Sequence, residues 1–233
     1  MIKFFRRIRR KLFDERNTKR YLIYAIGEIL LVMIGILLAM QVSNLNNLKI
    51  DNAAEKNFYR NFKRQIFEDL QIINGTIDYN NNYKNQYQYA IEIIEENDRS
   101  EMDTLGYIAL KLTKYSDADR PSNIYESIVN SGEIKLLKND RIIERIQVLE
   151  ETYFYFNRME SIHYDFVKSI IPELITSIKY SNRKVEQAHK LFDYKFQNLF
   201  KISVDIMNEK DDVYNRAKDQ IMELTQLIDE ELN

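Results

Sequence analysis

The chain has 233 residues, no cysteine, and 34 lysines and arginines against 36 aspartates and glutamates. Without cysteine it has neither a disulfide framework nor a thiol nucleophile. Its 5 glycines and 2 prolines are few turn formers for this length, which disfavours an all-β fold and favours long helices.

The charges are distributed unevenly along the chain. Residues 1–20 hold nine basic and two acidic side chains, which leaves 25 basic and 34 acidic side chains in residues 21–233. A basic segment before an apolar run, with an acidic segment after it, follows the positive-inside rule of membrane proteins. We therefore expect residues 1–20 to be a cytoplasmic tail on the inner membrane and residues 43–233 to lie in the periplasm.

The basic tail places Phe5, Ile8 and Leu12 at helical spacing among arginines and lysines. This pattern is typical of a short helix in the headgroup layer, but a positive flank that only fixes the topology would look the same. Either way, a tail of this length is too short for a folded kinase, cyclase or DNA-binding domain, and we expect no nucleic-acid partner. Five side chains are expected to contact anionic lipid: Arg6, Arg7, Arg9, Arg10 and Lys11.

Residues 21–42 read YLIYAIGEILLVMIGILLAMQV, and Glu28 is their one carboxylate. A helix of this length rises about 33 Å, enough to cross a hydrocarbon core of about 30 Å. A cleaved signal peptide is the alternative, but the run is longer than the roughly 7–15 residues of its apolar region. The end of the run also lacks a clear small-x-small cleavage site. We therefore predict a single transmembrane helix that is retained as a signal anchor.

One face of this predicted helix carries Glu28, Gly35 and Ala39 at spacings that return to the same side. Gly35 and Ala39 form a small-x-x-x-small pair, which lets two helices approach closely. A carboxylate at this depth costs at least ~2–3 kcal/mol, so Glu28 should be protonated or partnered, unless it reaches back to the headgroups. We predict an association face, and hence a homo-oligomer or a membrane-protein partner.

Helical periodicity continues after the apolar run. Residues 53–73 carry an amphipathic stripe, and Asn74-Gly75 is a turn signal that is expected to end or kink this helix. A loop is expected at residues 116–120, and Gly132 has the place of a glycine cap. Further helices are expected over residues 76–97, 101–115 and 123–130.

The strongest helical pattern follows Asn139, which is an N-cap type of residue. Residues 178–184 break the pattern, a last helical stretch runs from Val185 towards Leu232, and Asp193 is a possible interruption. Long amphipathic helices need partners, so we predict an all-α fold: one N-terminal transmembrane helix followed by an elongated extracytoplasmic helical bundle. The seam of the strongest helix has coiled-coil spacing: Ile142, Ile146, Leu149, Tyr153, Phe156, Glu160, His163, Val167, Ile170 and Leu174.

Both histidines follow a glutamate at i−3, in the pairs Glu160/His163 and Glu186/His189. Two such motifs are half of the ligand set of a di-iron carboxylate bundle. With a chain turn near residues 179–182, however, the histidines would lie about 13 Å apart along antiparallel helices, which is too far for a shared metal. We expect an ordinary Glu–His contact within each helix and no metal or cofactor. No phosphate loop or serine elbow is present.

Three blocks of residues carry a family resemblance: Phe4-Phe5-Arg6-Arg7 with Tyr21-Leu22, Gly27-Glu28 and Gly35-Ile36-Leu37; Tyr125-Glu126-Ser127-Ile128 with Ser131-Gly132, Leu136-Leu137 and Asn139; and Phe196 with Asn198-Leu199. With these blocks the chain resembles a family of small single-span membrane proteins of Bacteroidota that is defined as a domain of unknown function. Where that family often has a tryptophan after the span, this chain has Leu45. The resemblance implies a membrane-anchored, outward-facing helical domain and no known activity, substrate or cofactor.

The sequence therefore favours a non-enzymatic, membrane-anchored interaction or scaffold protein. The alternative is a ligand-sensing extracytoplasmic bundle that signals through a separate partner. An enzyme comes third, and a pocket lined by several convergent ionisable groups would be the feature that favours it.

Overall fold

The computed structural model describes residues 18–118, 120 and 124–233. The basic side chains from Arg6 to Lys11 that we expect at the lipid surface lie outside the described residues. Helices make up 88% of the described residues, which confirms the all-α class. The chain divides into two units, Met1–Ala54 and Glu55–Asn233.

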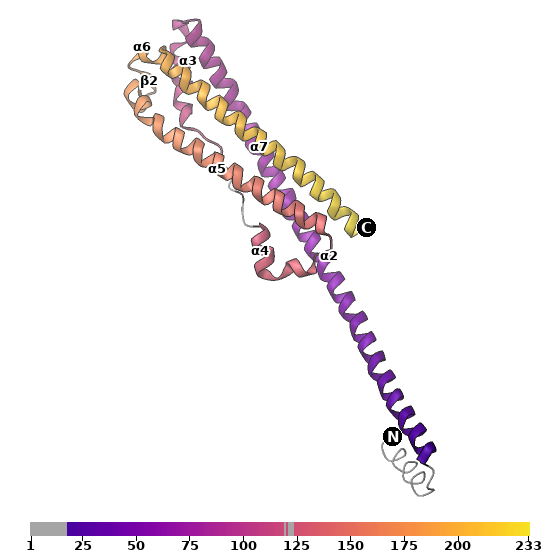
Figure 1. The fold of residues 1–233 in the computed structure, drawn as a ribbon. Helices are drawn as coiled ribbons and strands as arrows, with labels where there is room; N and C mark the ends of the chain where they lie inside the picture. The colour runs from indigo at the N-terminus through magenta and orange to yellow at the C-terminus, as the bar shows by residue number, and fades with distance from the viewer. Residues whose placement is uncertain (1–17, 119, 121–123) are drawn as a thin grey trace. The chain divides into compact units, whose positions relative to one another are not determined.

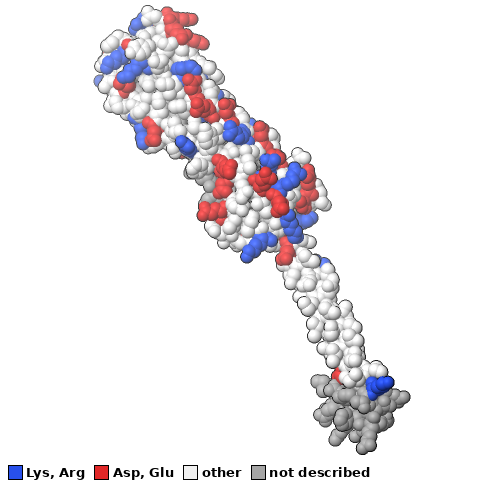
Figure 2. All heavy atoms as spheres, in the orientation of Figure 1, with Lys and Arg blue, Asp and Glu red and all other residues white. Residues whose placement is uncertain are grey.

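Helix α2 (Thr18–Glu95) is the longest element, and its residues up to Ala54 belong to the first unit. Within it, an 18-residue window has a mean hydropathy of 2.5, and none of that window is buried. By length and composition the helix can cross a membrane, which fits a single-pass membrane protein and equally fits a signal sequence. Figure 2 shows few charged side chains along the described part of this unit.

The expected helix end at Asn74-Gly75 is wrong, because α2 continues through both residues. Glycine inside a helix costs about 1 kcal/mol relative to alanine. That cost is outweighed here by the buried side chains on either side, Ile73 and Thr76, which hold the backbone against the core.

The second unit contains, after its part of α2, the following elements in chain order (Figure 1): η1 (Arg99–Glu101), α3 (Met102–Leu110), η2 (Lys111–Thr113), α4 (Ile124–Ser131), η3 (Glu133–Leu136), α5 (Asp140–Ser177), β1 (Ile178–Lys179), β2 (Lys184–Val185), α6 (Ala188–Leu191) and α7 (Tyr194–Leu232).

Side-chain pairs set the direction in which the long helices of this unit pack. Lys63 binds Asp229 at 2.5 Å and Gln197 donates to Glu95 at 2.8 Å, so α2 and α7 run antiparallel. Helices α5 and α7 also lie side by side and antiparallel, as Figure 1 shows. Two ion pairs join them: Arg145–Glu223 and Glu173–Lys195.

The apolar stripes of these helices meet in two clusters. The first cluster includes Ile66 and Ile73 of α2, Ile124 and Ile128 of α4, Ile142, Ile146, Leu149 and Phe156 of α5, and Ile221 and Leu224 of α7. The second cluster includes Tyr87 and Ala90 of α2, Leu105 and Ile108 of α3, Ile170 and Leu174 of α5, and Phe196, Phe200 and Met207 of α7. Burying each large apolar side chain contributes roughly 1.5–3 kcal/mol. The predicted seam of α5 is therefore confirmed as a core stripe.

Local signals set several helix ends as expected. The Asn139 side chain accepts hydrogen bonds from the backbone N–H groups of Arg141 and Ile142, and the Asp193 side chain accepts one from the N–H of Lys195. Gly132 has a φ of 81°, a left-handed conformation that glycine adopts without strain. The helical stretch that we expected from Val185 does not begin there.

A short antiparallel hairpin occupies that place instead. Ile178 pairs with Val185 and Lys179 with Lys184. The hairpin packs against α3 at Gly106, where a Cβ atom would lie 2.5 Å from Val185 Cγ2. Only glycine at position 106 allows this close contact. Val185 of the hairpin belongs to the second cluster, so the contact anchors the hairpin there.

Candidate functional site

Polar side chains are buried between the two apolar clusters of the second unit. The segment between η2 and α4 passes through this level, since Leu112 belongs to the second cluster and Ala118 to the first. A buried polar group that lacks a hydrogen-bond partner destabilises the folded state, so the partners of these side chains matter for the stability of the core. We call this set the polar layer: Thr76 and Asn80 of α2, Ser116 of the segment, Glu160 and His163 of α5, and Lys210, Asp211 and Tyr214 of α7.

Lys210 lies at the centre of the polar layer and is fully buried. Its Nζ atom is 2.6 Å from the backbone oxygen of Ser116, 2.7 Å from Ser116 Oγ and 3.5 Å from His163 Nδ1. Burial lowers the pKa of Lys210 to about 8, and the negative charges of Glu160, Asp117 and Asp211 oppose this shift. The pKa of this lysine therefore lies nearer to neutral pH than that of an exposed lysine, although the protonated form still predominates at pH 7.

His163 is neutral in this environment. Burial, and then the positive charge of Lys210, lowers the pKa of His163 to about 3. A protonated Lys210 has only donors, so Nδ1 of His163 accepts and the ring proton lies on Nε2. The His163 ring also meets Tyr115 edge to face, with the ring centres 6.3 Å apart.

Glu160 joins the layer to the backbone of the crossing segment. Its Oε1 atom accepts from the backbone N–H of Ala118 at 2.8 Å and from the hydroxyl of Tyr214. Burial raises the pKa of Glu160, although these two hydrogen bonds and Lys210 oppose the shift. One carboxylate therefore holds both the segment and helix α7.

The two Glu-x-x-His pairs have different surroundings. Glu160 and His163 are buried, as their seam positions predict, and they contact Tyr214 and Lys210 of α7 rather than each other. Glu186 and His189 are exposed. Across residues 18–118, 120 and 124–233, no group of three or more histidines and carboxylates is arranged to hold a metal ion.

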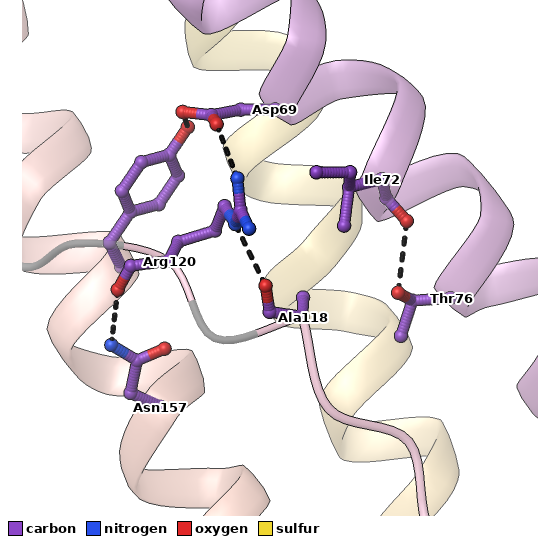
Figure 3. Close-up of polar contacts among 7 residues, drawn as sticks. Asp69, Ile72, Thr76, Ala118, Arg120 and Asn157 are labelled. Atoms are coloured by element: carbon purple, nitrogen blue, oxygen red, sulfur yellow. Dashed lines mark hydrogen bonds and ion pairs between the residues drawn. The ribbon is translucent and has the colours of Figure 1, made fainter.

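A second set of contacts holds the crossing segment at Arg120. Arg120 donates to Asp69 Oδ1 at 2.8 Å and to the backbone oxygen of Ala118 at 2.8 Å, as Figure 3 shows. Asn157 donates to the backbone oxygen of Arg120 at 2.6 Å. Tyr153 donates to the other oxygen of Asp69 at 2.9 Å. Both oxygens of this buried carboxylate are satisfied, so the segment is tied to α2 and α5 together.

Helix α2 is tied to α7 at the same level. Asn80 donates to Asp211 Oδ1 at 2.6 Å, and Lys84 binds Asp211 Oδ2 at 2.5 Å. Thr76, one turn before Asn80, donates to the backbone oxygen of Ile72 at 2.9 Å (Figure 3).

A surface hollow of about 550 Å³ borders the polar layer. Its walls are the α2 residues Ile72, Gly75, Thr76 and Tyr79 and the segment residues Thr113, Lys114, Tyr115, Ser116 and Asp117. No atom lies within 4 Å of the place where a Cβ of Gly75 would be, so this part of the wall is open. Ser116 thus lines the hollow, although it is buried, and its side chain contacts the buried lysine.

Sequence reasoning missed Ser116 and Lys210. A signal for Lys210 was present, because it lies three residues after Met207 and four before Tyr214, in phase with the buried stripe of α7. A lysine in phase with an apolar stripe is a candidate for burial. Ser116 has no comparable signal, since its place depends on how an irregular segment crosses the core.

The predicted association face lies in the first unit. Glu28 is half-buried, whereas Gly35 and Ala39 are exposed, and all three share one side of α2. A Cβ atom at Gly35 would have no atom within 4 Å. Among the described residues, the face is thus sterically open at Gly35.

Comparisons with protein-family models, curated proteins and solved structures found no match. The resemblance to the single-span family of Bacteroidota stays a prediction.

Proposed function

We propose that the protein is a membrane-anchored interaction protein, with residues 21–42 as a single transmembrane helix and residues 43–233 as a periplasmic helical bundle. The exposed apolar stretch of α2 carries this proposal, because none of the 18 residues in its most apolar window is buried. A continuous apolar surface of this length is stable against lipid and costly in water. A helix also satisfies its own backbone hydrogen bonds, as a lipid environment requires.

The charge distribution supports the orientation. Basic side chains gather before the span, and acidic ones predominate after it. Figure 2 shows acidic and basic side chains interspersed over the second unit, which is a surface suited to water. The tail, including Arg6, Arg7, Arg9, Arg10 and Lys11, would then contact the anionic inner leaflet.

The interaction role rests on surfaces that the described part of the chain leaves uncovered. In the span these are Gly35 and Ala39, beside Glu28, where a second helix can approach closely. In the second unit, α5 exposes the large apolar side chains Phe154 and Ile175, at 63% and 60%. Homo-oligomers or complexes with another membrane protein would cover such surfaces.

Fractionation and a topology reporter test the anchor. The full chain should stay in the membrane fraction after alkaline carbonate washing. Alkaline phosphatase fused after Asn233 should be active, because that enzyme folds only outside the cytoplasm, whereas a fluorescent protein that folds only in the cytoplasm should be dark. A carbonate-soluble chain, or the opposite reporter pattern, would refute the proposal.

A second candidate function is ligand sensing, and the hollow beside the polar layer favours it. Its volume of about 550 Å³ falls within the roughly 300–1,000 Å³ of small-molecule sites. The test is a thermal-shift screen of periplasmic metabolites against the wild type and Gly75→Leu. The added side chain projects into open space and blocks the hollow. A ligand that stabilises both proteins equally would count against the hollow as the sensing site.

A further inference from the structure

Lys210 Nζ donates to Ser116 Oγ in the structure. When the lysine is neutral, the same contact places a hydroxyl next to a base, which is the first requirement of a serine hydrolase. Ser116 Oγ and Lys210 Nζ are 2.7 Å apart, which is within the reach of a direct proton transfer. The backbone oxygen of Ser116, 2.6 Å from Nζ, and His163 Nδ1, 3.5 Å away, hold the amine in place. A neutral amine can donate to these two acceptors and still accept the hydroxyl proton.

Lysine acts as a base only when it is neutral, and the core favours that form. Burial lowers the pKa of Lys210 to about 8, so about a tenth of the molecules carry the free amine at pH 7. The charged groups that act on Lys210 come from three elements. Glu160 of α5, Asp117 of the crossing segment and Asp211 of α7 raise its pKa, while burial prevails.

Ser116 also borders a space that is large enough for a small substrate. Ser116 lines the hollow of about 550 Å³, and Tyr79 and Tyr115 form apolar walls there. Lys210 contacts Ser116 and is fully buried, so water does not compete for its lone pair. A residue in the wall of the hollow thus has its hydroxyl next to a buried amine, a pairing that a nucleophilic site requires.

The geometry points to Ser116 and Lys210 as a catalytic dyad that hydrolyses small esters or amides bound in this hollow. The Ser116 hydroxyl proton passes to Lys210 Nζ while Oγ attacks the carbonyl carbon. The ammonium then returns the proton to the departing alcohol or amine, and the acyl group stays on Ser116. Water then attacks the acyl carbon while Lys210 takes one of its protons. The bond between the acyl carbon and Ser116 Oγ breaks, Lys210 returns the proton to Oγ, and a carboxylic acid leaves. His163 is a positioning residue for Lys210 and does not touch the substrate.

This inference departs from the non-enzymatic role that the sequence favours. The ionisable residues that line the hollow itself are Lys114 and Asp117, and Ser116 connects the hollow to the buried Lys210 of the polar layer. The proposed Ser116–Lys210 dyad does not depend on the transmembrane helix or on the association proposed above.

Covalent labelling of the full chain in detergent tests the dyad. A fluorophosphonate probe is added between pH 6 and 9.5, and the modified peptide is located by mass spectrometry. We expect an adduct on Ser116 that forms faster as the pH rises through about 8, the pKa of Lys210. Ser116→Ala should abolish labelling, and Lys210→Arg, which cannot become neutral, should slow it about 100-fold or more.

Two variants separate the dyad from general effects. Ser203→Ala is the matched control, because Ser203 is also buried but donates only to the backbone oxygen of Leu199; it should label like the wild type. Gly75→Leu leaves both dyad residues intact and fills the hollow, so it should slow labelling. Thermal melting and circular dichroism establish that each variant is folded.

Folded wild type without an adduct on Ser116 would overturn the inference, and so would equal labelling of Lys210→Arg. If Lys210→Arg does not fold, the pH profile of wild-type labelling tests whether a lysine acts as the base. A labelling rate that does not change between pH 6 and 9.5 then excludes a lysine base.

Discussion

Replacing His163 by glutamine should remove much of the protein's sensitivity to acid. His163 is buried against Lys210, with Nδ1 at 3.5 Å from Nζ. A proton on the imidazole would place two positive charges next to each other away from water, so the folded state excludes it. Glutamine keeps an oxygen acceptor for the lysine and has no titrating group.

The size of the effect follows from the two pKa values of the imidazole. The folded pKa is about 3, whereas an unfolded chain titrates at about 6.5. Between these values the unfolded state binds a proton that the folded state does not, so the stabilising effect is complete above about pH 6.5 and is lost as the pH falls. At ~1.4 kcal/mol per pKa unit, the wild type should lose about 2 kcal/mol between pH 7 and pH 5, and about 5 kcal/mol in full.

The assay is urea unfolding of the full chain in detergent, followed by helical circular dichroism at pH 7, 6 and 5. The loss of unfolding free energy should be about 2 kcal/mol smaller in His163→Gln than in the wild type. His189→Gln is the matched control, because His189 is the other histidine of the chain and is exposed. Equal pH slopes for the wild type and His163→Gln would refute the burial argument, as would a changed slope in His189→Gln.

The other predictions concern one contact each. Asp69→Asn removes the charge that binds Arg120 and should cost about 3 kcal/mol of unfolding free energy by urea titration; a loss below about 0.5 kcal/mol would show that the segment is held by other contacts. Gly106→Ala puts a methyl group against Val185 and should cost about 1–3 kcal/mol; an unchanged melting temperature would mean that the hairpin moves away freely. Gly35→Ile and Glu28→Leu should each weaken crosslinking of the full chain in membranes; undiminished crosslinking of both would exclude this face as the site of association.

Periodicity and end signals predicted much of the helical structure. The stripe from Ile142 to Leu174 is buried as its spacing requires, because a long amphipathic helix in a compact unit has one way to cover its apolar side. Asn139 and Asp193 were readable as helix ends because their side chains bond to backbone groups two or three residues away. These are local effects, and they depend little on the rest of the fold.

Three features depended on contacts that the sequence does not display. Gly75 stays helical because neighbouring side chains are held in the core. The hairpin at Ile178–Val185 forms because Gly106, far away in sequence, admits Val185. Lys210 becomes a buried base candidate because Ser116 and His163 come to it from two other elements.

The amino-acid sequence by itself determined that this chain is helical, that its charge changes sign across an apolar run, and where several helices end. All of these arise from neighbours within a few turns of one helix. Only the tertiary structure decided which polar side chains leave water together, because burial is a property of packed elements. The meeting of Ser116, His163 and Lys210 between two apolar clusters, and the altered pKa values that burial causes there, therefore could not be read from spacing alone.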